Sequence, residues 1–226
     1  IENPEETLDI NIGGTLNILE ACRKHKKKLI FASTSEVYGS SQVYQMDELH
    51  QLDAQRPYGA SKVSGDRLCK SYIDTYGMDI AILRNFNTFG EYQNDGSYGG
   101  VIAIFTGQAL NGDDITIYGD GMQERDYMHI SDALEGYKIA SQITGVVNVG
   151  TGDTVSVKEI AEMIKEITGT SSEIVHKEDR TGEVLRLCAD ITKAQEHGFQ
   201  PSTDFRKHLT NYVNWYERNI FNPSRD

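Results

Sequence analysis

The chain has 226 residues, enough for one large domain or two small ones around a sizeable core. It carries 22 Lys and Arg against 34 Asp and Glu, and the net charge of −12 argues against a general nucleic-acid or polyanion binder. A local basic pocket for a diphosphate is still compatible with that charge. No apolar run approaches membrane-spanning length and no signal peptide opens the chain, so no membrane partner is expected.

The cysteines indicate a reducing environment. Cys22, Cys69 and Cys188 are odd in number and far apart, so a disulfide framework is not expected. We therefore predict a cytoplasmic protein. No internal repeat or low-complexity tract interrupts the chain, and we assign no metal ligands.

The first predicted elements are a helix and a strand. Apolar residues recur at near-helical spacing over residues 3–25, and the basic run at 24–28 suits the carboxyl end of a helix dipole. The apolar run that ends at Ala32 has the length and bounds of a buried strand. Thr34, Ser35 and Glu36 then lie at the strand's carboxyl end, where open α/β sheets bind their ligands.

A second helix starts near Tyr58, which follows a proline, and it stops at Gly77, a typical C-terminal cap. Lys62 lies four residues after Tyr58, so both side chains leave the same helix face. An ammonium beside a phenol favours the phenolate and lowers its pKa, as a general base acting on an alcohol requires. Thr34 could share the same substrate hydroxyl. Taken alone, this spacing is more typical of an ordinary helix surface.

The next predicted strand covers residues 78–83 and ends at Arg84-Asn85-Phe86-Asn87. Residues 91–100 are polar and glycine-rich, which is typical of a boundary between lobes. We therefore predict one domain over 1–98, to which residues of about 127–150 return, and a second lobe over 99–226.

The second half alternates helices and strands. Ser131 and Ser156 are the predicted N-caps of two of its helices. Strands are predicted at 115–118 and 145–150, and helices at 101–110, 130–144, 156–168, 189–194 and 205–220.

Two stretches together carry a family resemblance. Thr34-Ser-Glu-Val-Tyr-Gly39 and Pro57-Tyr-Gly-Ala-Ser-Lys62 resemble the catalytic core of the extended short-chain dehydrogenase/reductases, specifically the nucleotide-sugar epimerases and dehydratases. Further matches follow in the same order at Arg84–Gly90, Tyr118–His129 and Asn148–Gly152. The resemblance runs from about Pro4 to Tyr216. It implies an α/β fold, with a Rossmann-type parallel sheet and a smaller mixed α/β lobe that binds the substrate.

The resemblance also implies site residues and NAD as the cofactor. The implied catalytic residues are Thr34, Tyr58, Lys62 and Glu36. The implied cofactor-binding residues are Ser33, Tyr58, Lys62, Asn85 and Phe86. The implied nucleotide-sugar-binding residues are Thr34, Asn87, Val101, Tyr118, Arg125, Arg180 and Glu183. Asp126 and His129 are expected to orient their loop rather than react.

The implied reaction begins when Tyr58 removes the proton of the sugar C4 hydroxyl while C4 is oxidised. An epimerase needs little beyond Thr34, Tyr58 and Lys62, whereas a 4,6-dehydratase also needs a base and an acid. Glu36 has the position of the dehydratase base, although the loop at Arg125–His129 resembles the epimerase version. We expect a UDP-glucose/galactose-like 4-epimerase, with a dTDP-, GDP- or UDP-hexose 4,6-dehydratase as the alternative. Decarboxylating relatives can use the same Thr-Ser-Glu triplet.

One departure from the family pattern concerns the cofactor. In the family, a half with a Gly-rich turn against the pyrophosphate precedes the first helix, and Gly13-Gly14 does not fit that turn. We therefore expect the amino-terminal part of the sheet to be missing, which puts NAD binding by this chain in doubt and leaves a non-catalytic sugar-nucleotide module as a further alternative. The family resemblance also suggests a homodimer through the helices around residues 5–25 and 58–76, although their apolar stripes are equally compatible with a core.

Overall fold

A computed structural model of the chain describes residues 3–41, 43–96, 99–179, 182 and 184–222. One parallel sheet has the strand order β1-β2-β7, formed by β1 (Leu29–Thr34), β2 (Ile80–Asn85) and β7 (Gly145–Val149). The predicted α/β class is confirmed. Among the described residues, the helices are too short or too polar to cross a membrane.

The sheet brings three strand ends to one edge. Thr34 is paired with Asn85, and Asn85 is paired with Val149, so the last residues of all three strands lie at the same level. Because every pairing is parallel, this edge collects carboxyl ends only, as the sequence predicts for the site.

Strand β2 is buried on both faces, which explains its continuous apolar run. Ile80 and Ile82 pack in a cluster with Leu19 and Cys69. The alternate residues of the strand, Ala81 and Leu83, pack in a second cluster together with residues of helix α5 (Ile130–Ala140). The two-residue period of the strand therefore builds one core on each face of the sheet.

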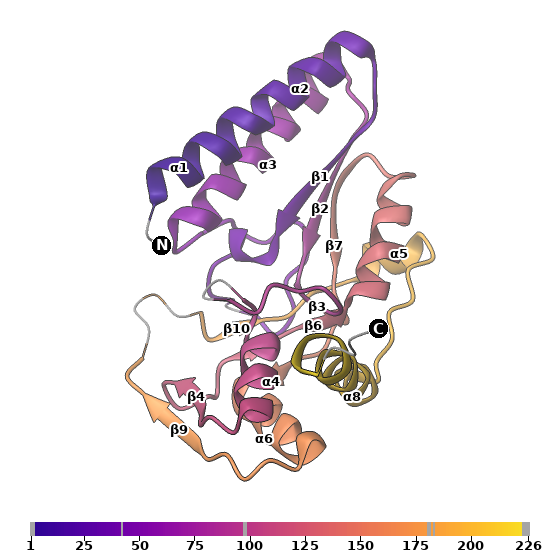
Figure 1. Cartoon of the computed structure of the whole chain (residues 1–226). Helices are drawn as coiled ribbons and strands as arrows, with labels where there is room; N and C mark the ends of the chain where they lie inside the picture. The colour runs from indigo at the N-terminus through magenta and orange to yellow at the C-terminus, as the bar shows by residue number, and fades with distance from the viewer. Residues whose placement is uncertain (1–2, 42, 97–98, 180–181, 183, 223–226) are drawn as a thin grey trace.

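On the first face lies a long helical segment beside α3 (Figure 1). It runs through α1 (Pro4–Leu8), the π-helical turn η1 (Asp9–Gly13) and α2 (Gly14–His25), so the predicted helix over 3–25 is confirmed. Helix α3 covers Pro57–Tyr76 and ends at Gly77, whose φ of 63° is left-handed. The apolar side chains that recur at helical spacing in the first helix are largely exposed, since Leu19 is the one buried residue of α2.

On the opposite face of the sheet lie α5 (Ile130–Ala140) and α7 (Thr192–Glu196). The predicted N-cap of α5 was Ser131, and this is wrong. His129 is the cap, because its Nδ1 accepts the backbone N–H of Ser131 at 3.3 Å. The predicted cap at Ser156 is confirmed, and it forms a reciprocal capping box with Glu159.

A second group of elements lies below the sheet in Figure 1 and shares its own apolar cluster. Its parallel pairs join β3 to β6 and β4 to β9, while β5 lies between β10 and β8. The strands are β3 (Asn87–Phe89), β4 (Ile115–Tyr118), β5 (Glu124–Arg125), β6 (Tyr127–His129), β8 (Val155–Ser156), β9 (Ile174–Lys177) and β10 (Arg186–Leu187). The helical segments are α4 (Val101–Asn111), α6 (Val157–Thr168), α8 (Phe205–Tyr216) and the π-helical turn η3 (Glu217–Phe221). The division into domains at residue 98 stays a prediction.

Candidate active site

The candidate site is built where β1 ends. Thr34 is the last residue of β1, and its Oγ1 accepts the backbone N–H of Glu36 at 3.3 Å, which starts the turn η2 (Ser35–Val37). Tyr58 lies in the first turn of α3 and its hydroxyl is hydrogen-bonded to the Thr34 side chain. The fold therefore joins two predicted catalytic residues that lie 24 positions apart in the printed sequence.

Close packing holds α3 against this turn. A Cβ on Gly59 would lie 2.9 Å from the carbonyl oxygen of Glu36, a distance that real side chains do not adopt. Glycine at this position therefore lets the first turn of α3 lie directly on the backbone of η2. This contact fixes the height of Tyr58 above the edge of the sheet.

The predicted electrostatic pairing of Lys62 with Tyr58 is wrong for this structure. Burial raises the pKa of Tyr58, and the negative charge of Glu36 raises it further, while the hydrogen bond from Thr34 acts in the opposite direction. The Lys62 ammonium lies 4.9 Å from the centre of the Phe31 ring. Burial lowers the pKa of Lys62, and the nearby Asp66 opposes that shift. Lys62 is thus directed along α3 towards Phe31 and Asp66.

The residues predicted to hold NAD lie at the same edge. Ser33 is buried and its Oγ has no partner among the described residues, and the same is true of Asn85 Oδ1. The Asn85 amide donates to the Tyr137 hydroxyl at 3.3 Å, and Phe86 is buried beside it. Because an unpaired buried polar atom costs free energy, both oxygens fit a ligand rich in hydrogen-bonding groups, as NAD is.

The predicted substrate residues meet at one cavity. Asn87, Val101, Tyr118 and Arg125 all line a hollow of about 610 Å³ below the sheet. A smaller hollow of about 100 Å³ adjoins it and reaches Thr34 and Phe86. The two hollows share Glu36, Arg56, Asn87 and Arg125. The reacting edge and the larger cavity are therefore continuous.

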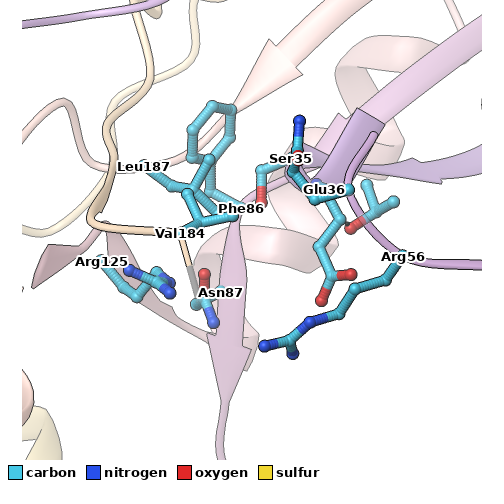
Figure 2. Close-up of a pocket in the computed structure, with 10 residues that line it drawn as sticks. Ser35, Glu36, Arg56, Phe86, Asn87, Arg125, Val184 and Leu187 are labelled. Carbon is cyan, nitrogen blue, oxygen red and sulfur yellow. Dashed lines mark hydrogen bonds between the residues drawn. The ribbon is translucent and has the colours of Figure 1, made fainter. Parts of the chain in front are cut away.

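Figure 2 shows the smaller hollow, with Arg125 and Arg56 on either side of Asn87. Arg125 is held by its backbone surroundings, since its Nη1 donates to the carbonyl oxygen of Glu124 at 2.9 Å. Asn87 is the first residue of β3 and its backbone N–H donates to Asp126. Both polar side chains thus extend from strands at the edge of the hollow.

The larger cavity has groups suited to a nucleoside diphosphate. Helix α4 begins at Val101, and its N-cap Gly100 has no side chain to occupy the free amide groups. Such amides bind phosphate groups well. Tyr118 is the register partner of Lys177 at the end of the β4/β9 pair, so a ring and a cation lie on one wall. The predicted ligands Arg180 and Glu183 lie outside the described residues.

The site residues predicted from the sequence do not include two cationic residues that line the larger cavity. Arg56 and Lys177 both line the larger cavity. Arg56 could have been found from the sequence, because it lies two residues before Tyr58.

Asp126 and His129 bind neighbouring backbone groups, as expected of residues that orient their loop. Asp126 is fully buried and accepts the backbone N–H groups of Thr151 at 2.7 Å and of Gly152 at 3.0 Å.

A buried polar network lies behind the site. The carboxylate of Asp66 on α3 accepts from Arg84 Nε at 2.8 Å, and Arg84 Nη1 donates to the Tyr38 hydroxyl at 2.9 Å. Tyr38 in turn donates to Asn148 Oδ1 at 2.6 Å. Burial raises the pKa of Tyr38 to about 12, which keeps it protonated as a donor. The network ties α3, and with it Tyr58, to β2 and β7.

Comparisons with known proteins show the family and the fold of the chain. The family model described as GDP-mannose 4,6 dehydratase matches residues 1–212. A protein of Methanocaldococcus jannaschii, named provisionally as a UDP-glucose 4-epimerase, is 38% identical over 97% of this chain and 73% of its own length.

Two solved structures share the fold over almost the whole chain. The UDP-glucose 4-epimerase of Thermotoga maritima, solved with UDP-glucose, has a TM-score of 0.92 and 32% identity over 96% of this chain and 72% of its own. The dTDP-glucose 4,6-dehydratase of Streptomyces venezuelae, solved with NAD, has a TM-score of 0.91 and 29% identity over 97% and 69%. The predicted resemblance and fold are confirmed: the chain belongs to the extended short-chain dehydrogenase/reductase family, among the NAD-dependent nucleotide-sugar epimerases and dehydratases.

Proposed function

We propose that the protein is an NAD-dependent nucleotide-sugar 4-epimerase that acts on a UDP-hexose through a transient 4-keto sugar. The observation that carries the proposal is the hydrogen bond between Tyr58 and Thr34, because Thr34 lines the small hollow that adjoins a cavity suited to a nucleoside diphosphate. A phenol and a hydroxyl in this arrangement can hold one sugar hydroxyl between them.

In this proposal Tyr58 takes the proton of the C4 hydroxyl, and Thr34 keeps that hydroxyl oriented. NAD, when bound, supplies the reversible oxidation at C4. Ser33, Asn85 and Phe86 would hold it together with Tyr58 and Lys62. Burial and Glu36 both raise the pKa of Tyr58, so a positive charge near the phenol is needed to favour the phenolate.

The substrate assignments rest on the larger cavity. Tyr118 would stack on the nucleobase and Arg125 would pair with the diphosphate, to which the free amides at Val101 also point. Asn87, which lies between Arg125 and Arg56 in Figure 2, would also bond the diphosphate. Arg180 and Glu183 stay proposed ligands on the basis of the sequence resemblance.

A 4,6-dehydratase is the second candidate, and one observation favours it. Glu36 lines the small hollow together with Thr34, so a carboxylate lies next to the place proposed for the reacting sugar. In a dehydratase, Glu36 would remove the C5 proton before the C6 hydroxyl leaves. A non-catalytic binding module is the third candidate, and the preserved pairing of Thr34 with Tyr58 weighs against it.

We further propose a homodimer through the segments around residues 5–25 and 58–76. Four apolar side chains of the first segment support this, because each is at least 37% exposed: Leu8, Ile10, Leu16 and Ile18. A cytoplasmic location is proposed on the basis of the three free cysteines.

The substitution Tyr58→Phe tests the proposed base. It removes the phenolic oxygen and keeps the ring, so we expect turnover to fall about 10²- to 10⁴-fold, while UDP-glucose affinity and the melting temperature change little. Steady-state kinetics with NAD and UDP-glucose, together with calorimetric titration, separate the two effects. A variant that retains the full rate would remove Tyr58 from the chemistry.

A further inference from the structure

Gln108 lines the larger cavity, and one hydrogen bond fixes the direction of its side-chain amide. Its Oε1 accepts the backbone N–H of Thr116 at 3.2 Å. Because a backbone N–H can only donate, the side-chain atom that faces Thr116 must be the oxygen, and the amide nitrogen Nε2 points away from it. No hydrogen-bond acceptor for Nε2 lies among the described residues. Gln108 therefore presents an oriented donor to the cavity.

The place of Gln108 along α4 sets its distance from the proposed diphosphate site. The side of α4 towards the cavity carries four residues at helical spacing: Val101, Ile104, Phe105 and Gln108. Since a helix rises by about 1.5 Å per residue, Gln108 lies about 10 Å beyond Val101 along the axis. A nucleotide whose phosphates meet the amides at Val101 therefore extends its base towards Gln108.

Strand β4 places an acceptor beside this donor. Ile115 donates its backbone N–H to the carbonyl oxygen of Glu173, which immediately precedes β9. Backbone groups alternate in direction along a strand, so the next residue, Thr116, turns both its N–H and its C=O away from β9. The N–H of Thr116 binds Gln108, and the carbonyl oxygen opens to the same side. Gln108 Nε2 and the Thr116 carbonyl oxygen are thus a donor and an acceptor at one end of the cavity.

A donor beside an acceptor is the complement of one edge of uracil. Uracil presents its 4-carbonyl as an acceptor and its N3–H as a donor, whereas cytosine presents a 4-amino donor and an N3 acceptor. We infer that Gln108 binds the 4-carbonyl of uracil through Nε2 and thereby selects a keto base over an amino base; this rests on the proposed nucleotide-sugar function. Thymine and guanine carry the same pair of groups, so Gln108 selects a class of base.

The length of the cavity indicates which carbonyl of uracil is bound. The 2-carbonyl lies beside the bond to the ribose, and the 4-carbonyl lies on the opposite side of the ring. With the phosphates at Val101, the 4-carbonyl is the group that reaches Gln108. Thr116 and Tyr118 line the cavity, whereas Ile117 between them is fully buried. The ring proposed to stack on the base therefore lies on the same face of β4 as the bond partner of Gln108.

Isothermal titration of the full chain with UDP and with CDP tests the inference, because the two nucleotides have the same size and charge and differ at the edge that Gln108 faces. We expect UDP to bind about 10- to 100-fold more tightly, since CDP sets a donor against Nε2 and leaves both groups unpaired.

Two substitutions of Gln108 separate its donor from the rest of the site. In Gln108→Glu, one oxygen keeps the bond from Thr116 and the other accepts from the amino group of cytosine, so the preference for UDP over CDP should fall about 10-fold or more. The added charge opposes both diphosphates equally and cancels in that ratio. Gln108→Leu removes the donor without adding a charge, so it should weaken UDP and change CDP little. Gln142→Glu adds the same charge at an exposed position after α5 and serves as the matched control.

The outcomes separate the inference from the proposed function. Equal binding of UDP and CDP by the wild type, or a preference that both Gln108 variants retain, would overturn the inference and leave the nucleotide-sugar function standing. If the wild type binds neither nucleotide, the proposed function fails, and the inference fails with it. Thermal melting identifies a variant that does not fold, and the other variant together with the wild-type preference then provides the test.

Discussion

Arginines occupy two different environments on either side of the sheet edge, one buried and one at a cavity. Arg84 is 4% exposed, and Asp66 and Tyr38 accept its hydrogen bonds behind the sheet edge. Arg56 and Arg125 line an open cavity in front of the same edge. The buried arginine ties α3 to the sheet, whereas Arg56 and Arg125 line the cavity proposed to bind the substrate. The same residue type therefore stabilises the fold in one region and lines a cavity in the other.

The largest expected effect comes from the buried region. Arg84→Met leaves the Asp66 carboxylate buried without its cation, so we expect a loss of about 3–5 kcal/mol in the free energy of unfolding. Urea denaturation measures it. The double variant Arg84→Met/Asp66→Leu removes both charges and should recover part of the loss. A single variant as stable as the wild type would show that the network does not hold α3.

Substitution of Arg125 should weaken substrate binding and change the stability little, in contrast to substitution of Arg84. Arg125→Ala removes a proposed partner of the diphosphate, so we expect UDP-glucose affinity to fall about 10- to 100-fold. The melting temperature should change much less than in Arg84→Met. Titration calorimetry and thermal melting on the same preparation compare the two. Unchanged affinity would exclude Arg125 from the diphosphate site.

A smaller effect is expected at Glu36. Its charge raises the pKa of Tyr58, so Glu36→Gln should lower that pKa, and the phenolate should form at lower pH. The value of kcat/KM should rise with pH as Tyr58 loses its proton. In the variant this rise should occur at a lower pH than in the wild type. An epimerase should otherwise keep its turnover, whereas a dehydratase should lose it because C5 deprotonation stops. A pH profile that does not move would mean that Glu36 does not act on Tyr58.

Local patterns were enough to predict much of the fold. The strand before Thr34, the helix from Pro57 to Gly77 and the capping box at Ser156 depend on neighbours in the sequence, and all three are confirmed. The cavity residues Asn87 and Tyr118 came from the family resemblance, since no local pattern places them together. Only the fold brings them to one hollow.

Side-chain directions could not be predicted in the same way. Lys62 lies four residues from Tyr58 and four residues from Asp66, so helical spacing allows it to turn either way. Burial against Phe31 decides the direction in the structure. Arg84 was placed near a strand end by the sequence, but its partner Asp66 lies 18 residues earlier, and only tertiary packing shows the pair.

The most direct test of the central claim is proton NMR of the protein in D2O with NAD and, in parallel, UDP-glucose, UDP-glucuronic acid, and dTDP- and GDP-glucose. The proposed epimerase inverts C4 of a UDP-sugar and leaves C5 free of deuterium, because Tyr58 acts on the C4 hydroxyl alone. A 4-keto-6-deoxy product that carries solvent deuterium at C5 would contradict the claim and identify Glu36 as the base of a dehydratase.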